Sequence, residues 1–264
     1  MNDQSSPFSI LDNFSQFEFY SPMDLNIKGK RALVLGASSG LGFAIAKALS
    51  AEGASLVISS SNPERINAAA KEINAKGIAA NLDQRGAATA LVEAAAKALD
   101  GLDILVTNSG PPPPGSFSQL CLDDWEFAHQ RVTMSAIESI YAALPHMKRG
   151  SWGRILLSTS CAVKEPIQTM SASVSYRAAL VAAIKNISRE VALDGITINA
   201  LLPGYFETEV MEKYDLDAIK SEIPVGRLGK PEEYGALAAF LSSEHAAYIT
   251  GQAMMPDGGM SKSW

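Results

Sequence analysis

The chain has 264 residues, 47% of them hydrophobic and 19% charged, and its formal net charge at pH 7 is −6. This length is enough to enclose one large core and lies within the range of a single α/β domain. The negative charge argues against nucleic acid and anionic membranes as main partners, because no basic face is available to bind phosphates.

An amino-terminal segment, residues 1–24, precedes the first regular pattern. It carries several aromatic residues among Ser, Asp and Asn, namely Phe8, Phe14, Phe17, Phe19 and Tyr20. Disorder is the usual state of a terminus, but disordered segments are poor in aromatic residues. We therefore expect an added arm that packs on the body or on a neighbouring subunit, followed by one domain over residues 25–264.

A short apolar run, a glycine-rich turn and an amphipathic stretch follow over residues 30–49. The run 32–35 is typical of a parallel strand that is buried on both faces. Gly36, Gly40 and Gly42 let the backbone turn tightly and approach a ligand. Free N–H groups at the start of the following helix would then face a phosphate. This context favours a dinucleotide site over a plain turn.

The remaining patterns alternate between strands and helices. Strands are predicted at 55–59, 78–82, 103–107, 154–158 and 197–202 and just before Asp257, with helices at 63–76, 87–99, 123–129, 133–147, 173–193 and 232–242. Such alternation indicates an α/β fold with a doubly wound parallel sheet and helices on both faces. Ligands of such sheets bind beyond the carboxyl ends of the strands.

Five motifs occur in a fixed order along the chain. They are the glycine turn 36–42, TNSG at 107–110, GRILLSTS at 153–160, Pro203-Gly204, and Asp-Gly-Gly at 257–259. In this order they resemble the short-chain dehydrogenase/reductase family, whose first turn reads TGxxxGxG and has Thr where this chain has Leu35. The resemblance covers about residues 27–260. It implies a single-domain Rossmann-type fold, dinucleotide binding and redox chemistry on a small or medium organic substrate.

The resemblance also implies a set of cofactor contacts at the carboxyl ends of the strands. They are Gly36, Ser38, Ser39, Gly40, Leu41, Gly42, Ser60, Ser61, Asn81, Leu82, Asn108, Ser109, Gly110, Arg177, Pro203 and Gly204. No carboxylate follows the second strand, where NAD enzymes commonly hold the ribose 2′-hydroxyl, so NADP(H) is favoured over NAD(H). Ser61 stands where similar sequences often carry Arg. Arg65, one helical turn on, is a candidate substitute, and an exposed helix residue is the alternative.

The catalytic positions of the family are only partly retained. Its Asn-Ser-Tyr-Lys set corresponds without gaps to Val132, Ser160, Ser173 and Arg177, so only the Ser is kept. In the family the Tyr passes a proton to or from the substrate oxygen, and the Lys lowers the pKa of that Tyr. Arg177 keeps the positive charge but cannot donate a proton, since its pKa lies above about 12. A serine hydroxyl is a poor acid unless a neighbouring base activates it.

Tyr176 and Lys164 are further candidates for proton transfer. Using Tyr176 as the acid needs three extra loop residues and leaves Leu180 at the Lys position. On a helix, Ser173 and Arg177 share a face from which Tyr176 is turned by about 100°. Packing at a subunit interface is the alternative for Tyr176. Lys164 lies in the loop over the expected site, and a solvated surface lysine is its alternative.

Signals for other classes of protein are weak. No apolar run reaches the length of a transmembrane helix, and no basic stretch followed by an apolar core opens the chain. Cys121 and Cys161 are too few for a disulfide framework, and the three histidines lack metal-ligand spacing. We expect a cytoplasmic protein with no metal site.

Three functions are therefore open. The first is an NADP(H)-dependent oxidoreductase that interconverts carbonyl and alcohol with an altered proton relay. The second is a cofactor-binding pseudo-subunit that assembles with a homologous, active subunit, and the third is non-redox chemistry on the same scaffold. The resemblance also implies a homotetramer or homodimer built on the helices at 133–147 and 173–193 and on the C-terminal segment.

Overall fold

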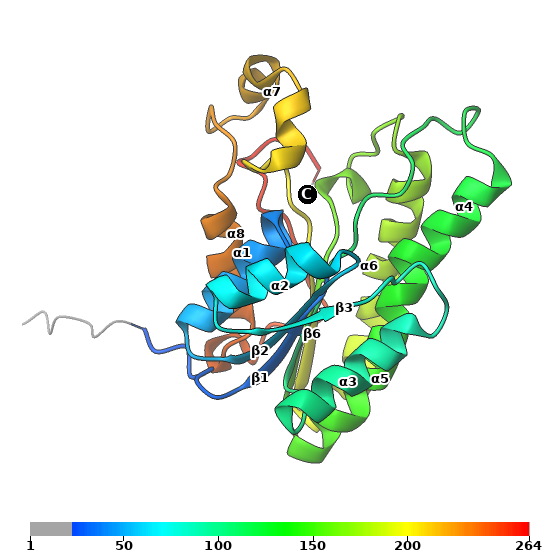
Figure 1. The fold of residues 1–264 in the computed structure, drawn as a ribbon. Coiled ribbons are helices and arrows are strands. Elements are labelled where there is room, and N and C mark those ends of the chain that lie inside the picture. The colour runs from blue at the N-terminus through cyan, green and yellow to red at the C-terminus, as the bar shows by residue number, and fades with distance from the viewer. Residues whose placement is uncertain (1–22, 264) are drawn as a thin grey trace, which may run out of the picture.

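The computed structural model describes residues 23–263, and its centre is one seven-stranded parallel sheet (Figure 1). The strand order is β3-β2-β1-β4-β5-β6-β7. The strands are β1 (Arg31–Val34), β2 (Ser55–Ser60), β3 (Lys76–Ala79), β4 (Ile104–Thr107), β5 (Gly153–Ser158), β6 (Ile196–Leu201) and β7 (Ala253–Met254). The order reverses direction between β1 and β4, which makes the sheet doubly wound and confirms the predicted fold class.

Helices cover both faces of this sheet (Figure 1). On one face lie α1 (Gly40–Ala51), α2 (Pro63–Glu72) and α8 (Pro231–Leu241). On the other lie α3 (Ala87–Leu99), α5 (Ser135–Gly150) and α6 (Ser171–Val191). The carboxyl ends of the strands therefore meet at one edge of a three-layered body, where ligands of such sheets bind.

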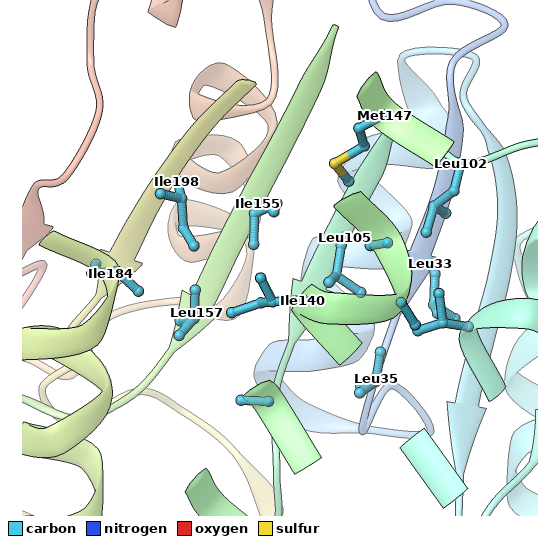
Figure 2. Close-up of a cluster of buried hydrophobic side chains, with 14 of the residues drawn as sticks. Leu33, Leu35, Leu102, Leu105, Ile140, Met147, Ile155, Leu157, Ile184 and Ile198 are labelled. Atoms are coloured by element: carbon cyan, nitrogen blue, oxygen red, sulfur yellow. The ribbon is translucent and has the colours of Figure 1, made fainter. Parts of the chain in front are cut away.

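Continuous apolar runs form the central strands because both faces of the sheet are buried. In β5, Ile155 and Leu157 pack toward α5 and α6, whereas Leu156 packs toward α8. Figure 2 shows Ile155 and Leu157 beside Ile140 of α5 and Ile184 of α6. Full burial of each such side chain contributes about 1.5–3 kcal/mol, so the sheet is a rigid base for the loops at its edge.

Three regions differ from the predicted elements. The strand predicted at 78–82 lies at Lys76–Ala79, because the helix before it ends earlier than predicted. The helix predicted to Lys76 ends at Glu72, because Ile73 closes it and Asn74 adopts a left-handed backbone with φ of 53°. The loop after β6 contains a 3₁₀ segment, Glu209–Lys213, and α7 (Leu216–Glu222), neither of which the sequence patterns predicted. Both are short and are held by a small cluster of side chains above the carboxyl edge of the sheet, centred on Met211, Ile223 and Leu228.

The amino-terminal arm predicted at 1–24 lies almost wholly outside the described residues, which begin at Met23. The predicted division at residue 25 therefore stays a prediction. The helix α4 (Leu122–Ala128) is continued to α5 by a π-helical stretch, His129–Met134. This stretch carries Val132, which the resemblance aligns with the Asn of the family, into the core under α6.

Candidate functional site

The glycine turn between β1 and α1 fits closely against the end of β4. Gly36 and Gly40 have φ values of 60° and 59°, which side chains rarely tolerate. A Cβ atom at Gly36 would lie 2.7 Å from the carbonyl oxygen of Asn108, and one at Gly42 would lie 2.3 Å from that of Gly36. Asn108 Nδ2 also donates a hydrogen bond to the Gly36 carbonyl, at 3.0 Å. A side chain at Gly36 or Gly42 would clash with neighbouring backbone, so this tight turn requires glycine at both positions.

A cleft of about 460 Å³ lies along this turn. Every predicted cofactor contact lines it except Gly42, Arg177, Pro203 and Gly204. Residues outside the predicted set of cofactor contacts also line it, namely Ser59, Ala80, Asp83, Pro111, Arg131, Thr208 and Val210. Those from the loop after β6 could not be found by pattern, because that loop folds over the cleft from more than 160 residues further along the chain.

Charge in this cleft is already balanced. Asp83 is the only carboxylate among its lining residues, and Arg131 neutralises it through two hydrogen bonds, Nε to Oδ1 at 2.7 Å and Nη2 to Oδ2 at 2.6 Å. Arg131 Nη1 also donates to the Pro111 carbonyl at 3.3 Å. No unpaired carboxylate of a lining residue is left to repel the phosphates of a ligand.

One observation that does not depend on any family pattern supports a dinucleotide in the cleft, namely a hydroxyl in its wall that is unpaired within residues 23–263. The hydroxyl of Ser59, at the end of β2, is buried and has no hydrogen-bond partner among the described residues. A buried polar group without a partner is costly, and a ligand hydroxyl or phosphate in the cleft would satisfy it. The glycine turn, Ser59 to Ser61 and Asn108 to Gly110 are the residues that would hold such a cofactor.

A second set of polar groups lies where β5 ends and α6 passes over it. Arg177 Nε donates to Ser173 Oγ at 3.3 Å, and Nη1 donates to the carbonyls of Ser158 and Thr159 at 3.3 and 3.1 Å. Arg177 thereby ties Ser173 to the end of β5, directly before Ser160. The Ser160 hydroxyl accepts a hydrogen bond from the Ala162 amide at 3.2 Å. The structure brings Ser173 and Arg177 together and links Arg177 to the end of β5, two residues before Ser160.

The guanidinium of Arg177 is buried, with only 7% of the residue exposed, and no carboxylate of the described chain pairs with it. Burial is the main cause that lowers the pKa of Arg177 below its usual value, and Tyr234 opposes this shift. A small cavity adjoins Arg177, lined by Asn108, Ser109 and Ser158 together with apolar side chains such as Leu35 and Val132. A permanent positive charge therefore lies close to the Asn108–Gly110 wall of the cleft.

Tyr234 is a buried residue of this region that the sequence reading missed. Its hydroxyl lies 2.9 Å from Ser158 Oγ, and burial raises the pKa of the phenol well above its usual value. It supports the end of β5 from the face opposite Arg177. A Tyr on the apolar side of the predicted helix 232–242 was the available signal, because a buried phenol needs a polar partner.

The other two proton-transfer candidates lie apart from this pair. The Tyr176 ring is 5.8 Å from that of Trp125 and 5.3 Å from that of His129, so it packs among aromatic side chains of α4 and the π-helix. Lys164 is exposed at the end of the 3₁₀ turn after Ser160. A role of Tyr176 or Lys164 in proton transfer therefore stays a prediction. Burial raises the pKa of the Cys161 thiol, which keeps it protonated.

Two other findings bear on the class of protein. Within residues 23–263, each helix is too short or too polar to cross a bilayer. The same part of the chain holds no group of three or more His, Cys, Asp or Glu residues placed to bind a metal ion.

Comparison with known proteins places this geometry in a family. Residues 36–261 match the family model described as enoyl-(acyl carrier protein) reductase. The NADPH-dependent reductase BacG of Bacillus subtilis is 34% identical over 255 residues, which cover 89% of this chain and 98% of that protein. The 3-oxoacyl-[acyl-carrier-protein] reductase FabG of Aquifex aeolicus is 32% identical over 253 residues, which cover 90% and 100%.

A solved structure agrees with these matches. L-sorbose reductase from Gluconobacter frateurii, in complex with NADPH and L-sorbose, has 28% sequence identity and a TM-score of 0.86, covering 92% of this chain and 100% of that chain. Family model, relatives and fold coincide with the glycine turn, TNSG and Pro-Gly motifs at the edge of the sheet. The chain therefore belongs to the short-chain dehydrogenase/reductase family and is an NAD(P)-dependent oxidoreductase by its relatives.

Proposed function

We propose that this protein is an NADP(H)-dependent reductase that interconverts a carbonyl and an alcohol with an altered proton relay. The observation that carries the proposal is the hydrogen-bonded pair Ser173–Arg177 at the positions of the family Tyr and Lys. The cleft, its glycine turn and the lack of a carboxylate after β2 support cofactor binding. A relative described as NADPH-dependent and a similar structure in complex with NADPH support the choice of NADP(H).

The side chains at the end of β5 are suited to polarise a carbonyl. A nicotinamide cofactor, when bound, supplies the hydride. Ser160 Oγ accepts from the Ala162 amide and Ser173 Oγ accepts from Arg177, so the proton of each hydroxyl is free to be donated to a substrate oxygen. The buried charge of Arg177 stabilises negative charge that develops nearby, because the surroundings screen it poorly. The proton that completes the alcohol comes from water, since Arg177 stays protonated.

A second candidate is reduction of an activated carbon–carbon double bond. Two observations favour it: the family model is described as an enoyl reductase, and position 173 has no phenol to protonate an alkoxide. Hydride addition at the β-carbon breaks the C=C π bond and moves the electron pair onto the carbonyl as an enolate. Ser160, Ser173 and Arg177 would stabilise that oxygen, and water would protonate the α-carbon. This chemistry needs hydrogen-bond donors more than a strong acid.

One set of measurements tests these proposals. The purified protein is titrated with NADPH and NADH, and turnover is then followed on ketones, aldehydes and α,β-unsaturated carbonyls. We expect NADPH binding and turnover on one of these classes, which identifies the reaction. Ser160→Ala should lower turnover by at least tenfold, whereas Ser175→Ala, on the exposed face of α6, should not. NADPH binding without any turnover would instead indicate the pseudo-subunit, and no binding would contradict the proposal.

Rebuilding the usual pair tests whether the relay is altered or merely degraded. Ser173→Tyr combined with Arg177→Lys places the family's proton donor and its partner on one face of α6. In a drifted carbonyl reductase, general acid catalysis should then raise carbonyl reduction by about 10² to 10⁴. We expect no such gain on the native substrate, because the pocket around position 173 is packed for serine, which is 4% exposed.

The subunit arrangement and the cytoplasmic location stay predictions. In support of an oligomer, α5 exposes Tyr141, which is 75% accessible in the single chain. The small residues Ala178 and Ala179 of α6 would let another helix approach closely. Light scattering at micromolar concentration should give a dimer or tetramer, and a monomer would contradict this part of the proposal.

A further inference from the structure

Arg65, in the first turn of α2, reaches the glycine turn at the wall of the cofactor cleft. The Asn62 side chain caps α2 by accepting the Arg65 amide at 2.9 Å, which fixes the backbone from which the arginine extends. Arg65 Nη2 then donates to Ser39 Oγ at 3.3 Å. Ser39, Ser60 and Ser61 all line the cleft. The guanidinium therefore lies where the turn meets the end of β2, the region that holds the adenosine ribose in such folds.

The same nitrogen is shared with the loop on the other side of the cleft. Arg65 Nη2 is 3.1 Å from Oε2 of Glu209, which begins the 3₁₀ segment after β6. This loop lies directly over the glycine turn, since a Cβ atom at Gly40 would be 3.7 Å from Thr208 Cγ2. The Arg65–Glu209 pair thus joins α2 to the loop across the mouth of the cleft.

This ion pair is easily exchanged. The side chains of Arg65 and Glu209 are 53% and 71% exposed, and ion pairs with such exposure contribute little to stability. A phosphate monoester carries about −1.5 to −2 charges and three acceptor oxygens, so it attracts a guanidinium more strongly than one carboxylate does. A phosphate at the end of β2 would therefore compete with Glu209 for Arg65.

The surroundings accept such a phosphate. Ser59 Oγ is buried and has no hydrogen-bond partner within residues 23–263, and the Ser39, Ser60 and Ser61 side chains follow along the same wall. Arg131, which lines the cleft, is already held by both oxygens of Asp83. Arg65, in contrast, contacts a single oxygen of Glu209 through one nitrogen, at 3.1 Å.

We propose that Arg65 selects NADP(H) by binding its 2′-phosphate, and that Glu209 keeps Arg65 in place until the phosphate replaces this carboxylate. The inference rests on the proposed use of NADP(H). A cofactor without the 2′-phosphate leaves the Arg65–Glu209 pair intact. The phosphorylated cofactor releases Glu209, and with it the link between α2 and the loop that carries Thr208 and Val210.

The test uses two adenosine ligands that differ only in the phosphate. Adenosine 2′,5′-bisphosphate and 5′-AMP are titrated calorimetrically into the full-length protein and its variants. Arg65→Gln should weaken bisphosphate binding by at least tenfold and change 5′-AMP binding by less than twofold. Glu209→Gln should strengthen bisphosphate binding about two- to fivefold, because the competing carboxylate is removed. Lys71→Gln, an equal change of charge at the other end of α2, should alter neither.

The double variant Arg65→Gln/Glu209→Gln separates competition from a general charge effect. If Glu209 acts only through Arg65, the double variant should bind both ligands as Arg65→Gln does. Equal weakening of both ligands in Arg65→Gln, or weaker bisphosphate binding in Glu209→Gln, would overturn this inference and leave the proposed function standing. Failure of the unmodified protein to bind bisphosphate, NADPH or NADH would overturn both.

Discussion

Two buried arginines lie at opposite ends of β5, and they differ in whether a carboxylate compensates their charge. Arg154, at the start of β5, is 1% exposed, bonds to the carbonyls of Ser243 and Gly153, lies 3.4 Å from Glu244, and stacks over Trp152. Arg177, beyond the carboxyl end of β5, is 7% exposed and has only neutral hydrogen-bond partners within the described chain.

The difference concerns the cost of burying charge. Desolvation of a charge is expensive unless an opposite charge and hydrogen bonds replace the lost water. At the amino edge Glu244 supplies that compensation and opposes the effect of burial, which is the main cause of the lowered pKa of Arg154. At the carboxyl edge no carboxylate does so for Arg177. We propose that the uncompensated charge of Arg177 acts on a ligand. Substitution of Arg154 should then mainly affect stability, and substitution of Arg177 should mainly affect activity.

The largest expected loss of stability is at Arg154. Arg154→Met breaks its hydrogen bonds and leaves Glu244 with Trp152 Nε1, at 2.6 Å, in place of an opposite charge, so we expect the free energy of unfolding to fall by about 3 kcal/mol. Denaturant unfolding measures this change. NADPH affinity of the folded protein should stay within twofold of the original, because Arg154 lies at the opposite edge from the cleft. A stability loss below 1 kcal/mol would remove the basis for the comparison.

The matched substitution at the other edge is Arg177→Met. It removes the charge beside Ser173, and we expect turnover to fall at least a hundredfold, equivalent to about 2.7 kcal/mol of transition-state stabilisation. Stability should change by less than about 1 kcal/mol, since an uncompensated charge is removed together with its hydrogen bonds. If unfolding were shifted as much as in Arg154→Met, Arg177 would be a structural residue and the proposed relay would be wrong.

The sequence indicated the parts of this site that depend on local backbone. Gly36, Gly40 and the strand before them predicted the turn, because strand–turn–helix patterns reflect local geometry. It did not reveal the contacts made across the sheet. Tyr234 reaches Ser158 from a helix 76 positions away, and Glu209 reaches Arg65 across 144 positions. Such pairs depend on how the layers pack, and a single sequence carries no periodic signal for them.

A smaller effect is expected from substitution of Gly40, and comparison with Gly29 separates backbone strain from contact with the ligand. Gly40 and Gly29 both have a left-handed backbone, with φ of 59° and 76°, but only Gly40 lines the cleft. Gly40→Val should weaken NADPH binding at least tenfold, about 1.4 kcal/mol, because a branched side chain lies where a pyrophosphate must approach. Both variants should lower stability to a similar degree, because both positions have a left-handed backbone. Gly29→Val should leave NADPH binding unchanged. Equal affinities in the two variants would contradict the assignment of the turn to the cofactor.

The smallest effect concerns acid stability, and it comes from the amino edge. Burial alone would raise the pKa of Asp103, but hydrogen bonds from the Arg31 side chain and amide outweigh it and hold this pKa below its usual value. The contribution is therefore fully present above the pKa of Asp103 in the unfolded chain and is lost as pH falls through the lower pKa of the folded state.

Asp103→Asn should accordingly lower stability by about 1 kcal/mol at pH 7 and make little difference once the carboxyl of the folded protein is protonated. The exposed Asp123 of α4 provides the control, since Asp123→Asn should change stability at neither pH. Urea unfolding between pH 3 and 7 measures both variants. Because Arg177 remains protonated throughout that range, Arg177→Met should retain the acid sensitivity of the unmodified protein. A flattened pH profile in Arg177→Met would mean that the two edges are coupled, and the separation drawn between Arg154 and Arg177 would fail.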